Sequence, residues 1–244
     1  MDKQVVVIAD VHGCYKTLMA LVAQVPKDTE IAFVGDLIDR GPMSMEVVEF
    51  VKSNGYKCVK GNHESALADF ILKFDSEASV WQKWSEYGWL IKNGVDATLK
   101  SYGIDPDLPF KEVIDKIADN DKLIEHAEWM SRLPTYIEFN DVVNAEGKKL
   151  VISHSSVHSV WDRKDAPAAK NFFNETLMWN RINPITDVAG VYNLFGHTPH
   201  DEPRITSHYA NIDTGCCFAN ETLKYSLTAM SFPNMIIYKQ ENIE

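Results

Sequence analysis

The stretch Ile31-Ala-Phe-Val-Gly-Asp-Leu-Ile-Asp-Arg-Gly41 carries four apolar residues directly before two acids and an arginine. The apolar part is typical of a buried strand, and Gly35 lets the backbone turn where that strand ends. Asp36 follows the turn, and a carboxylate with its two oxygens can bridge two cations. Asp39 and Arg40 add a second acid and a positive charge. The stretch therefore predicts metal-binding chemistry at a strand end, with a capped turn and a surface ion pair as the plainer alternative.

Four further apolar runs end in polar residues of metal-binding types. In an extended backbone residues i and i+2 point the same way, so Asp10 and His12 can hold the same ion. Asn62 offers a neutral oxygen, which leaves His63 beside it free to act as an acid. Because strand ends meet at one edge of a sheet, we expect these groups to lie together. A mixed nitrogen and oxygen donor set suits manganese, iron or zinc more than magnesium or calcium. The candidate ligands are Asp10, His12, Asp36, Asn62, His154 and His197.

Each of these segments has an ordinary structural explanation when it is taken alone. An Asp after a strand is commonly a turn residue or a helix cap, and a lone Asn-His pair is usually a turn. A single histidine at a strand end can be a hydrogen-bonded core residue. The repetition of the same junction along the chain favours the metal-site interpretation. The remaining histidines have no place in this scheme and are expected at the surface or in packing; they are His126, His158, His200 and His208.

The composition limits the classes of function. With 244 residues, of which 45% are hydrophobic and 24% charged, the chain can bury a full core as one large domain or as a domain with an insertion. The net charge of −11 and the pI near 5.2 argue against an extended surface for nucleic acid or an anionic membrane. A phosphate group bound by this chain must therefore meet local positive charge, from metal ions and a few arginines.

The four cysteines indicate a reducing compartment. Cys14 and Cys58 are isolated and Cys216 and Cys217 are adjacent, so the C-x-x-C spacing of a zinc or redox site is missing from the sequence. They are expected to be reduced thiols in a cytoplasmic protein. The first apolar run, Val5–Ala9, is too short for a signal peptide or a membrane span. We expect a protein that is neither secreted nor bound to a membrane.

The first third of the chain repeats a strand, a turn and a helix, which predicts a parallel sheet. Ser44 is expected to cap the second helix, and Gly55 stands where its C-terminal cap belongs. The region from about Asp75 to Pro134 is predicted to be a helical insertion. Its four tryptophans are expected to pack between insertion and body, with substrate contact as the alternative. The last part is mainly strands, predicted over 136–139, 141–143, 149–153, 191–195, 209–213, 225–229 and 235–238.

These segments, in this order, resemble those of the calcineurin-like metallophosphoesterases, and within them the phosphoprotein phosphatase family. The segments are Asp10-Val-His12, Gly35 to Gly41, Gly61-Asn-His-Glu64, His154 and Gly196-His197. The similarity is greatest to serine/threonine phosphatases of the bacteriophage lambda type and their bacterial relatives. It spans nearly the whole chain and is weakest across the insertion. It implies an α/β (α+β) fold over residues 1–244, with two mixed sheets in a central sandwich, flanking helices and a helical cap over residues 75–134.

The resemblance also implies a role for each candidate residue. One metal would be held by Asp10, His12 and Asp36, and the other by Asp36, Asn62, His154 and His197. His63 would be the general acid, oriented by Asp39. Arg40 and Arg181 would bind the phosphoryl group through their guanidinium forks. The cofactor expected is a pair of divalent ions, with manganese first and iron or zinc as alternatives.

The expected activity is serine/threonine protein phosphatase, in which a hydroxide bridging two cations attacks phosphorus directly. Its substrate would be a phosphoprotein or a small phosphate ester. The segment Trp89–Leu99 is similar to bacterial enzymes of both the protein phosphatase and the dinucleoside tetraphosphatase kind. An alternative is therefore hydrolysis of dinucleoside tetraphosphates or of RNA 5′ caps at the same site. A binding module without activity and a metallonuclease are more remote, because all candidate ligands are present and a basic stripe is missing from the sequence.

Overall fold

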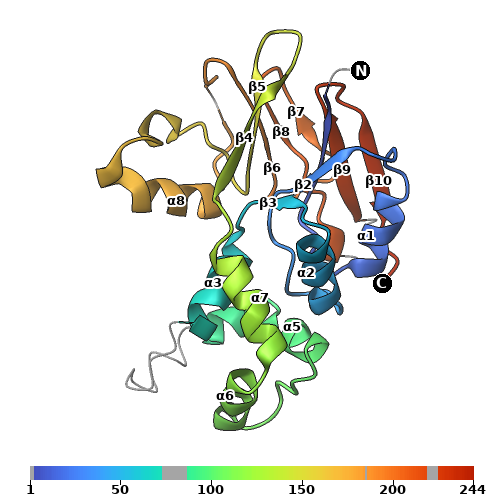
Figure 1. The fold of residues 1–244 in the computed structure, drawn as a ribbon, viewed down its shortest axis with the longest axis vertical. Coiled ribbons are helices and arrows are strands. Elements are labelled where there is room, and N and C mark those ends of the chain that lie inside the picture. The colour runs from blue at the N-terminus through green and yellow to red at the C-terminus, as the bar shows by residue number, and fades with distance from the viewer. Residues whose placement is uncertain (1–2, 73–86, 185, 219–224) are drawn as a thin grey trace.

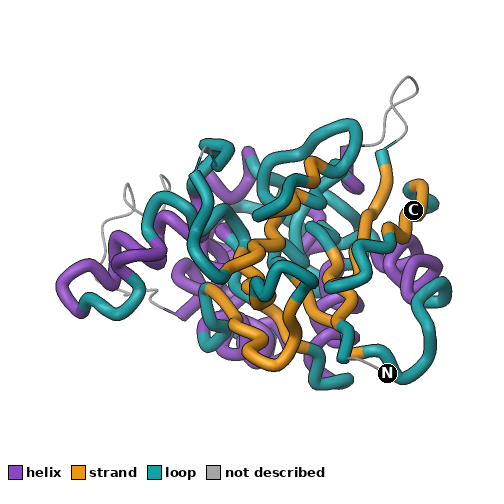
Figure 2. Tube along the Cα trace, turned by 90° about the horizontal axis from the view of Figure 1, so that it is seen from above, coloured by secondary structure: helices purple, strands orange, loops and turns teal. Residues whose placement is uncertain are grey.

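The computed structural model describes residues 3–72, 87–184, 186–218 and 225–244. Two mixed five-stranded sheets face each other at the centre, and helices lie outside them (Figures 1 and 2). The predicted sandwich with flanking helices is confirmed. The first sheet has the order β10 (Ile237–Glu241), β9 (Ser226–Phe232), β1 (Val5–Ile8), β2 (Glu30–Phe33), β3 (Lys57–Cys58). The second has the order β4 (Tyr136–Val143), β5 (Lys149–Ser153), β6 (Val191–Phe195), β8 (Tyr209–Asn211), β7 (Arg204–Ile205).

Each sheet contains three parallel strands, whose carboxyl ends lie at the same edge of that sheet. In the first sheet β1, β2 and β3 are parallel, and β9 and β10 close one side in antiparallel register. In the second sheet β5, β6 and β8 are parallel, with β4 and β7 as antiparallel edges. The α-helices that lie wholly within the described residues are α1 (Tyr15–Val22), α2 (Ser44–Ser53), α3 (Asn62–Leu72), α5 (Val95–Ser101), α6 (Phe110–Ala118), α7 (Asp121–Ser131) and α8 (Lys170–Trp179).

Strand β1 shows why its sequence is a continuous apolar run. Successive side chains of a strand point to opposite faces of the sheet. Val5 and Val7 lie in the core between the two sheets, whereas Val6 and Ile8 pack toward the helices on the outer face. All four side chains are fully buried. A strand covered on both faces needs apolar residues at every position. Buried parallel strands therefore show continuous apolar runs instead of alternating apolar and polar residues.

The helices between α3 and β4 share a core with the first sheet. Leu90, Leu99 and Val113 belong to the same apolar cluster as Ile8 and Phe33. Of the four tryptophans in the predicted insertion, Trp89 and Trp129 pack against this cluster, and Trp81 and Trp84 lie outside the described residues. The extent of the insertion, 75–134, stays a prediction.

Several boundaries differ from the predictions for local physical reasons. Ser44 is the first residue of α2 rather than its cap, which is Met43, and the Ser44 hydroxyl instead accepts a hydrogen bond from the backbone of Asp39. Gly55 has φ of +64°, the left-handed conformation expected just after a helix. The strands predicted over 136–139 and 141–143 form one strand, β4, with a register shift between Phe139 and Val143. The two-residue strand β7 was not predicted, because both of its side chains are exposed.

Candidate metal centre

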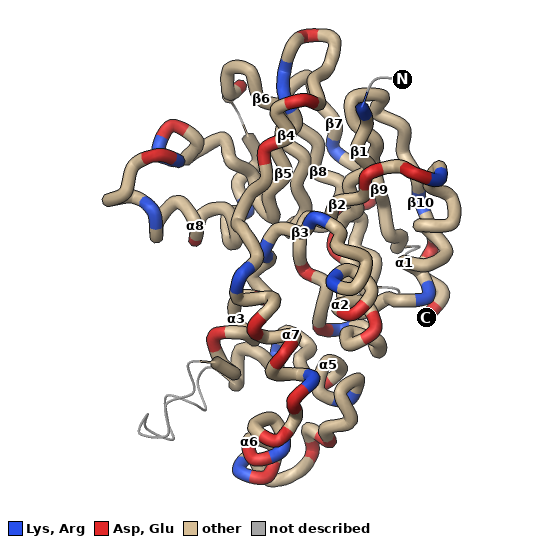
Figure 3. The backbone as a smooth tube through the Cα atoms, viewed as in Figure 1, with Lys and Arg blue, Asp and Glu red and all other residues tan. Residues whose placement is uncertain are grey.

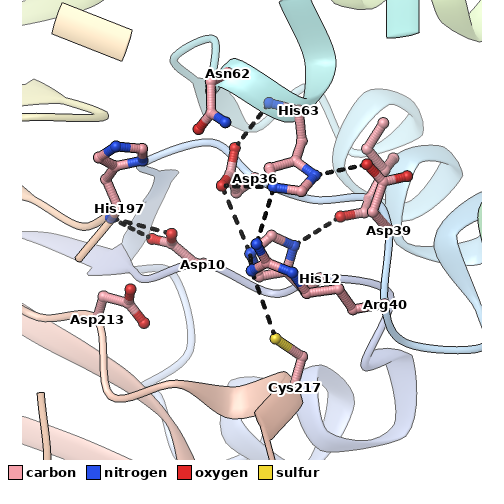
Figure 4. Close-up of polar contacts among 12 residues, drawn as sticks. Asp10, His12, Asp36, Asp39, Arg40, Asn62, His63, His197, Asp213 and Cys217 are labelled. Atoms are coloured by element: carbon pink, nitrogen blue, oxygen red, sulfur yellow. Dashed lines mark hydrogen bonds and ion pairs between the residues drawn. The ribbon is translucent and has the colours of Figure 1, made fainter. Parts of the chain in front are cut away.

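Five candidate residues meet where parallel strands of the two sheets end. Asp10 follows β1, Asp36 follows β2, Asn62 follows β3, and His154 and His197 follow β5 and β6. Each of these five side chains is nearly or fully buried. Hydrogen bonds join the two sheets at this point, because the backbone N–H of His197 donates to the Asp10 carboxylate at 3.0 Å. These side chains do gather as predicted, but at the strand ends of two sheets rather than along one edge of a single sheet (Figure 4).

Asp36 lies at the middle of the cluster. Its Oδ2 atom is 3.5 Å from Nε2 of His12 on one side and 3.4 Å from Nε2 of His154 on the other. Two groups whose candidate ligand atoms lie within 4.8 Å of one another share this residue: His12, Asp36 and His63, and Asp36, His154 and His197. A carboxylate common to two donor groups is the geometry needed to hold two cations side by side.

The second group contains three of the four donors predicted for the second metal, and the fourth, Asn62, lies beside it. Nε2 of His154 lies 3.0 Å from Oδ1 of Asn62 and 2.9 Å from Nδ1 of His197. These three atoms and Oδ2 of Asp36 thus converge within a small volume. The first group differs from the prediction, because it contains His63 where Asp10 was expected. The Asp10 carboxylate instead accepts the backbone N–H of His197, at the edge of the cluster.

Backbone carbonyls fix which ring nitrogen faces the centre. Nδ1 of His12 lies 2.8 Å from the carbonyl oxygen of Ile38, and Nδ1 of His154 lies 2.9 Å from that of Val34. A carbonyl only accepts, so each Nδ1 carries the proton and each Nε2 presents a lone pair to the cluster. Histidine ligands of metals are commonly oriented in this way. The donor set therefore fits divalent metal ions.

The charges of the buried groups also fit a cation. Burial lowers the pKa of His12 well below its ordinary value, and burial together with His154 lowers the pKa of His197 to about 3. Both imidazoles are therefore neutral and able to coordinate. Burial, followed by the charges of Asp213 and Asp36, raises the pKa of Asp10 well above its ordinary value. Carboxylates crowded into one buried site repel one another, and a bound cation reduces this repulsion.

His63 is positioned as a proton donor. It is the second residue of α3, and its Nδ1 lies 2.6 Å from Oδ2 of Asp39. Oδ1 of Asp39 accepts a hydrogen bond of 2.6 Å from the Thr98 hydroxyl. Burial alone would lower the pKa of His63, but the carboxylates of Asp36 and Asp39 raise it above its ordinary value. The start of the helix at Asn62 places His63 on a regular element.

The two arginines border different parts of the cluster. Nη1 of Arg40 is 2.5 Å from Nε2 of His12, and Nη2 is 3.2 Å from Nε2 of His63. A cation held by His12 would replace the first contact. Nη1 of Arg181 donates to the backbone carbonyl of His197 at 3.3 Å. Both guanidinium groups thus border the residues that could hold metal, although Arg181 is exposed.

The backbone around the site is strained. Seven non-glycine residues among those described have positive φ, and five of them are candidate site residues: His12, Asp36, Asp39, Arg40 and His197. Such conformations cost about 1–3 kcal/mol each and persist where the surroundings enforce them. The surroundings are closely packed here. A Cβ on Gly61 would lie 2.1 Å from Oδ1 of Asp36, and a Cβ on Gly196 would lie 2.0 Å from Oδ1 of Asp10.

Two acids of the site had no predicted role. Glu64 is fully buried, and its carboxylate accepts backbone N–H groups from Asp36, Leu37 and Gly61 at 2.7–2.9 Å. Burial, followed by the charge of Asp36, raises the pKa of Glu64 to about 7. Asp213 is also buried and faces the cluster (Figure 4), and burial raises its pKa to about 6. Glu64 stands in a segment quoted from the sequence and Asp213 ends a predicted strand, but the direction of each side chain depends on the tertiary structure.

Outside the site, charges of both signs are interspersed along the described chain (Figure 3). Within the described residues, helices long and apolar enough to cross a membrane are lacking.

Comparison with known proteins agrees with this geometry. The sequence profile of the family described as calcineurin-like phosphoesterase matches residues 3–201. A curated relative from Halalkalibacterium halodurans, named asymmetrical bis(5′-nucleosyl)-tetraphosphatase PrpE, is 30% identical over 255 residues, covering 94% of this chain and 90% of the relative.

Solved structures share the fold at lower identity. A candidate diadenosine tetraphosphatase is 19% identical with a TM-score of 0.62, and the match covers 100% of this chain and 96% of that one. A serine/threonine phosphatase from Saccharomyces cerevisiae with similarity to human PP5 is 14% identical with a TM-score of 0.58, covering 100% and 81%. The predicted resemblance is thus confirmed for the family. Its narrower form, the lambda type of serine/threonine phosphatase, is not what the curated relative's name indicates.

Proposed function

The chain belongs to the calcineurin-like phosphoesterase family, and we propose that within this family it hydrolyses dinucleoside tetraphosphates at a centre of two divalent metal ions. The observation that carries the proposal is the pair of donor groups that share Asp36, found in a chain 30% identical over 94% of its length to a relative named as a tetraphosphatase. The first gives the chemistry, which is hydrolysis of a phosphate bond. The second supports the proposed substrate class, which we prefer to the phosphoprotein expected from the sequence.

The proposed ligands divide between two ions. One ion would be held by His12 and Asp36 with Asp10, and the other by Asp36, Asn62, His154 and His197. When bound, the pair would activate a water molecule and stabilise the charge that develops on the phosphoryl oxygens. Manganese is the first choice of metal, with iron or zinc as alternatives, because nitrogen and oxygen donors are mixed.

The protein's own residues would supply binding and proton transfer. The guanidinium groups of Arg40 and Arg181 would hold phosphoryl oxygens, since each presents paired N–H donors. His63 would donate a proton from Nε2 to the departing group, while Asp39 holds its Nδ1. Donation of this kind contributes about 10²–10⁴ in rate for a basic leaving group. A nucleotide leaving group is less basic than an alkoxide, so the demand on His63 is smaller for the proposed substrate.

A second candidate function is hydrolysis of serine or threonine phosphate. The observation in its favour is the His63–Asp39 pair itself, because a strongly positioned acid is most useful when an alkoxide departs. The two candidates use the same metals and the same arginines, and they differ in what the surroundings of the site accept.

A substrate panel separates the two candidates. The manganese-loaded protein would be assayed with diadenosine tetraphosphate, a phosphoserine peptide and an aryl phosphate under one set of conditions. We expect kcat/KM for the dinucleotide to exceed that for the peptide by at least about 100-fold. Efficient turnover of the peptide with negligible turnover of the dinucleotide would replace the proposal by the second candidate. Failure to turn over any of the three, with metal in excess, would contradict both.

A further inference from the structure

Two tryptophans lie side by side next to the proposed catalytic acid. The ring centroid of Trp89 is 5.7 Å from that of His63. The ring centroid of Trp179 is 5.4 Å from that of Trp89, and the two tryptophan rings meet at an angle of 69°. Trp89 is partly buried and packs against the core, whereas Trp179 is 43% exposed. We call this pair the tryptophan shelf.

The segment from Trp179 to Arg181 connects the shelf to the metal-binding cluster. Trp179 is the last residue of α8, and Arg181 two residues later donates to the carbonyl of His197. The backbone carbonyl of Trp179 is in turn one of the groups that act on the pKa of His197. One short segment therefore carries both a proposed phosphate-binding arginine and an exposed aromatic ring.

The surface beside Trp179 is hollowed and lined by aromatic and polar side chains, and the Arg163 guanidinium lies 5.3 Å from the centre of the Phe172 ring at its border. A depression of 470 Å³ is lined by one face of α8 and its end, through Phe172, Glu175, Thr176, Trp179 and Asn180. The lining includes two aromatic rings, a hydroxyl, an amide and a carboxylate, and none of the five residues is a cation. A carboxylate repels phosphate, whereas aromatic rings with nearby amide and hydroxyl groups suit a neutral heterocycle.

We propose that the tryptophan shelf is a stacking site for a nucleobase of the substrate, with the exposed ring of Trp179 as its main contact. This proposal rests on the proposed function, because the shelf is the feature by which a nucleotide-hydrolysing site would recognise its substrate. A base and its phosphates are separated by one ribose, so a base on Trp179 leaves its phosphates free to reach the arginines and the metals. Stacking of a base on an aromatic side chain contributes about 1–3 kcal/mol, or roughly 5- to 150-fold in affinity.

Binding of two probes that differ only in the base tests the shelf. Affinities of the metal-loaded protein for AMP and for ribose 5-phosphate would be measured by calorimetry. We expect AMP to bind at least about fivefold more tightly, and Trp179→Ala to abolish this preference. Trp179→Phe, which keeps an aromatic ring, should retain most of it. The matched control is Ile182→Ala, an exposed apolar residue three positions along, and it should leave the preference unchanged.

The outcomes separate the shelf from the activity. Equal or unmeasurable affinities for the two probes in the unsubstituted protein, or a preference that survives Trp179→Ala, would overturn the shelf. An effect of Trp179→Ala on a phosphopeptide alone, with AMP binding unaffected, would assign the shelf to a protein substrate and also overturn it. If AMP is preferred through Trp179 but diadenosine tetraphosphate is not hydrolysed, the shelf stands and the proposed function fails.

Discussion

Nδ1 of His63 lies 2.6 Å from Oδ2 of Asp39, and the other oxygen of Asp39 accepts the hydroxyl of Thr98. This chain of contacts joins α3, the turn after β2 and α5, so it fixes the imidazole through its Nδ1 atom. Nε2 of His63 then faces the cluster around Asp36, at 3.8 Å from Oδ2. A histidine held in this way can give up a proton at one atom while its other nitrogen stays hydrogen-bonded.

Replacing His63 by Asn should affect substrates according to their leaving groups. We expect kcat for a phosphoserine peptide or another alkyl phosphate to fall by about 10²–10⁴, because an alkoxide needs a proton as it departs. The loss on an aryl phosphate should be less than about tenfold. Steady-state kinetics on both substrates with the same metal-loaded preparation would measure this. Equal losses on the two substrates would remove the acid role from His63.

Replacing Glu64 by Gln should weaken both folding and metal binding. The carboxylate accepts three backbone N–H groups, and an amide nitrogen in its place would face donors. We expect a loss of about 1–3 kcal/mol in the free energy of unfolding, with lower metal affinity because Asp36 is attached to this network. Urea unfolding and a metal titration would measure the two effects. Glu128→Gln, which alters an exposed ion pair, is the control and should change stability by less than about 0.5 kcal/mol. A Glu64 variant that matched this control would contradict the account.

Gly196→Ala should displace the Asp10 carboxylate. The added Cβ would lie 2.0 Å from Oδ1 of Asp10 and 2.9 Å from a methyl group of Val34. We expect destabilisation of about 1–3 kcal/mol and a weaker metal complex. Gly88→Ala is the matched control. Gly88 is helical, and a Cβ added there would meet no atom within 4 Å. The control should be neutral or slightly stabilising. Metal affinity that is equal in the two variants would exclude Asp10 from the ligands.

Stability should fall in mild acid partly through His158, which lies outside the proposed site. Burial, followed by the charge of His208, lowers the pKa of His158 to about 4. Below the unfolded value near 6.5 the unfolded chain takes up a proton that the folded chain does not, so folding weakens as pH falls toward 4. Between pH 7 and pH 5 the unsubstituted protein should lose about 2 kcal/mol more than His158→Gln. Urea unfolding at both pH values measures this, and parallel losses would contradict it.

The sequence predicted those parts of the site that follow apolar runs. Asp36 and His154 could be placed because each stands directly after a buried strand, and parallel strands bring their ends together. The roles of Glu64 and Asp213 could not be predicted, because an acid in a turn points toward a cap, the solvent or a buried N–H depending on the tertiary structure. The contact of Trp89 with Trp179 joins residues far apart in the chain, so spacing carried no signal for it.

The proposed activity is tested most directly by the products formed from diadenosine tetraphosphate in ¹⁸O-labelled water. The manganese-loaded protein would be incubated with the dinucleotide, and the products would be identified by chromatography and mass spectrometry. We predict ATP and AMP in equal amounts, with one ¹⁸O atom incorporated per cleavage, because water attacks phosphorus directly at one unsymmetrical position. An intact dinucleotide, in a preparation that hydrolyses phosphoserine peptide under the same conditions, would contradict the account.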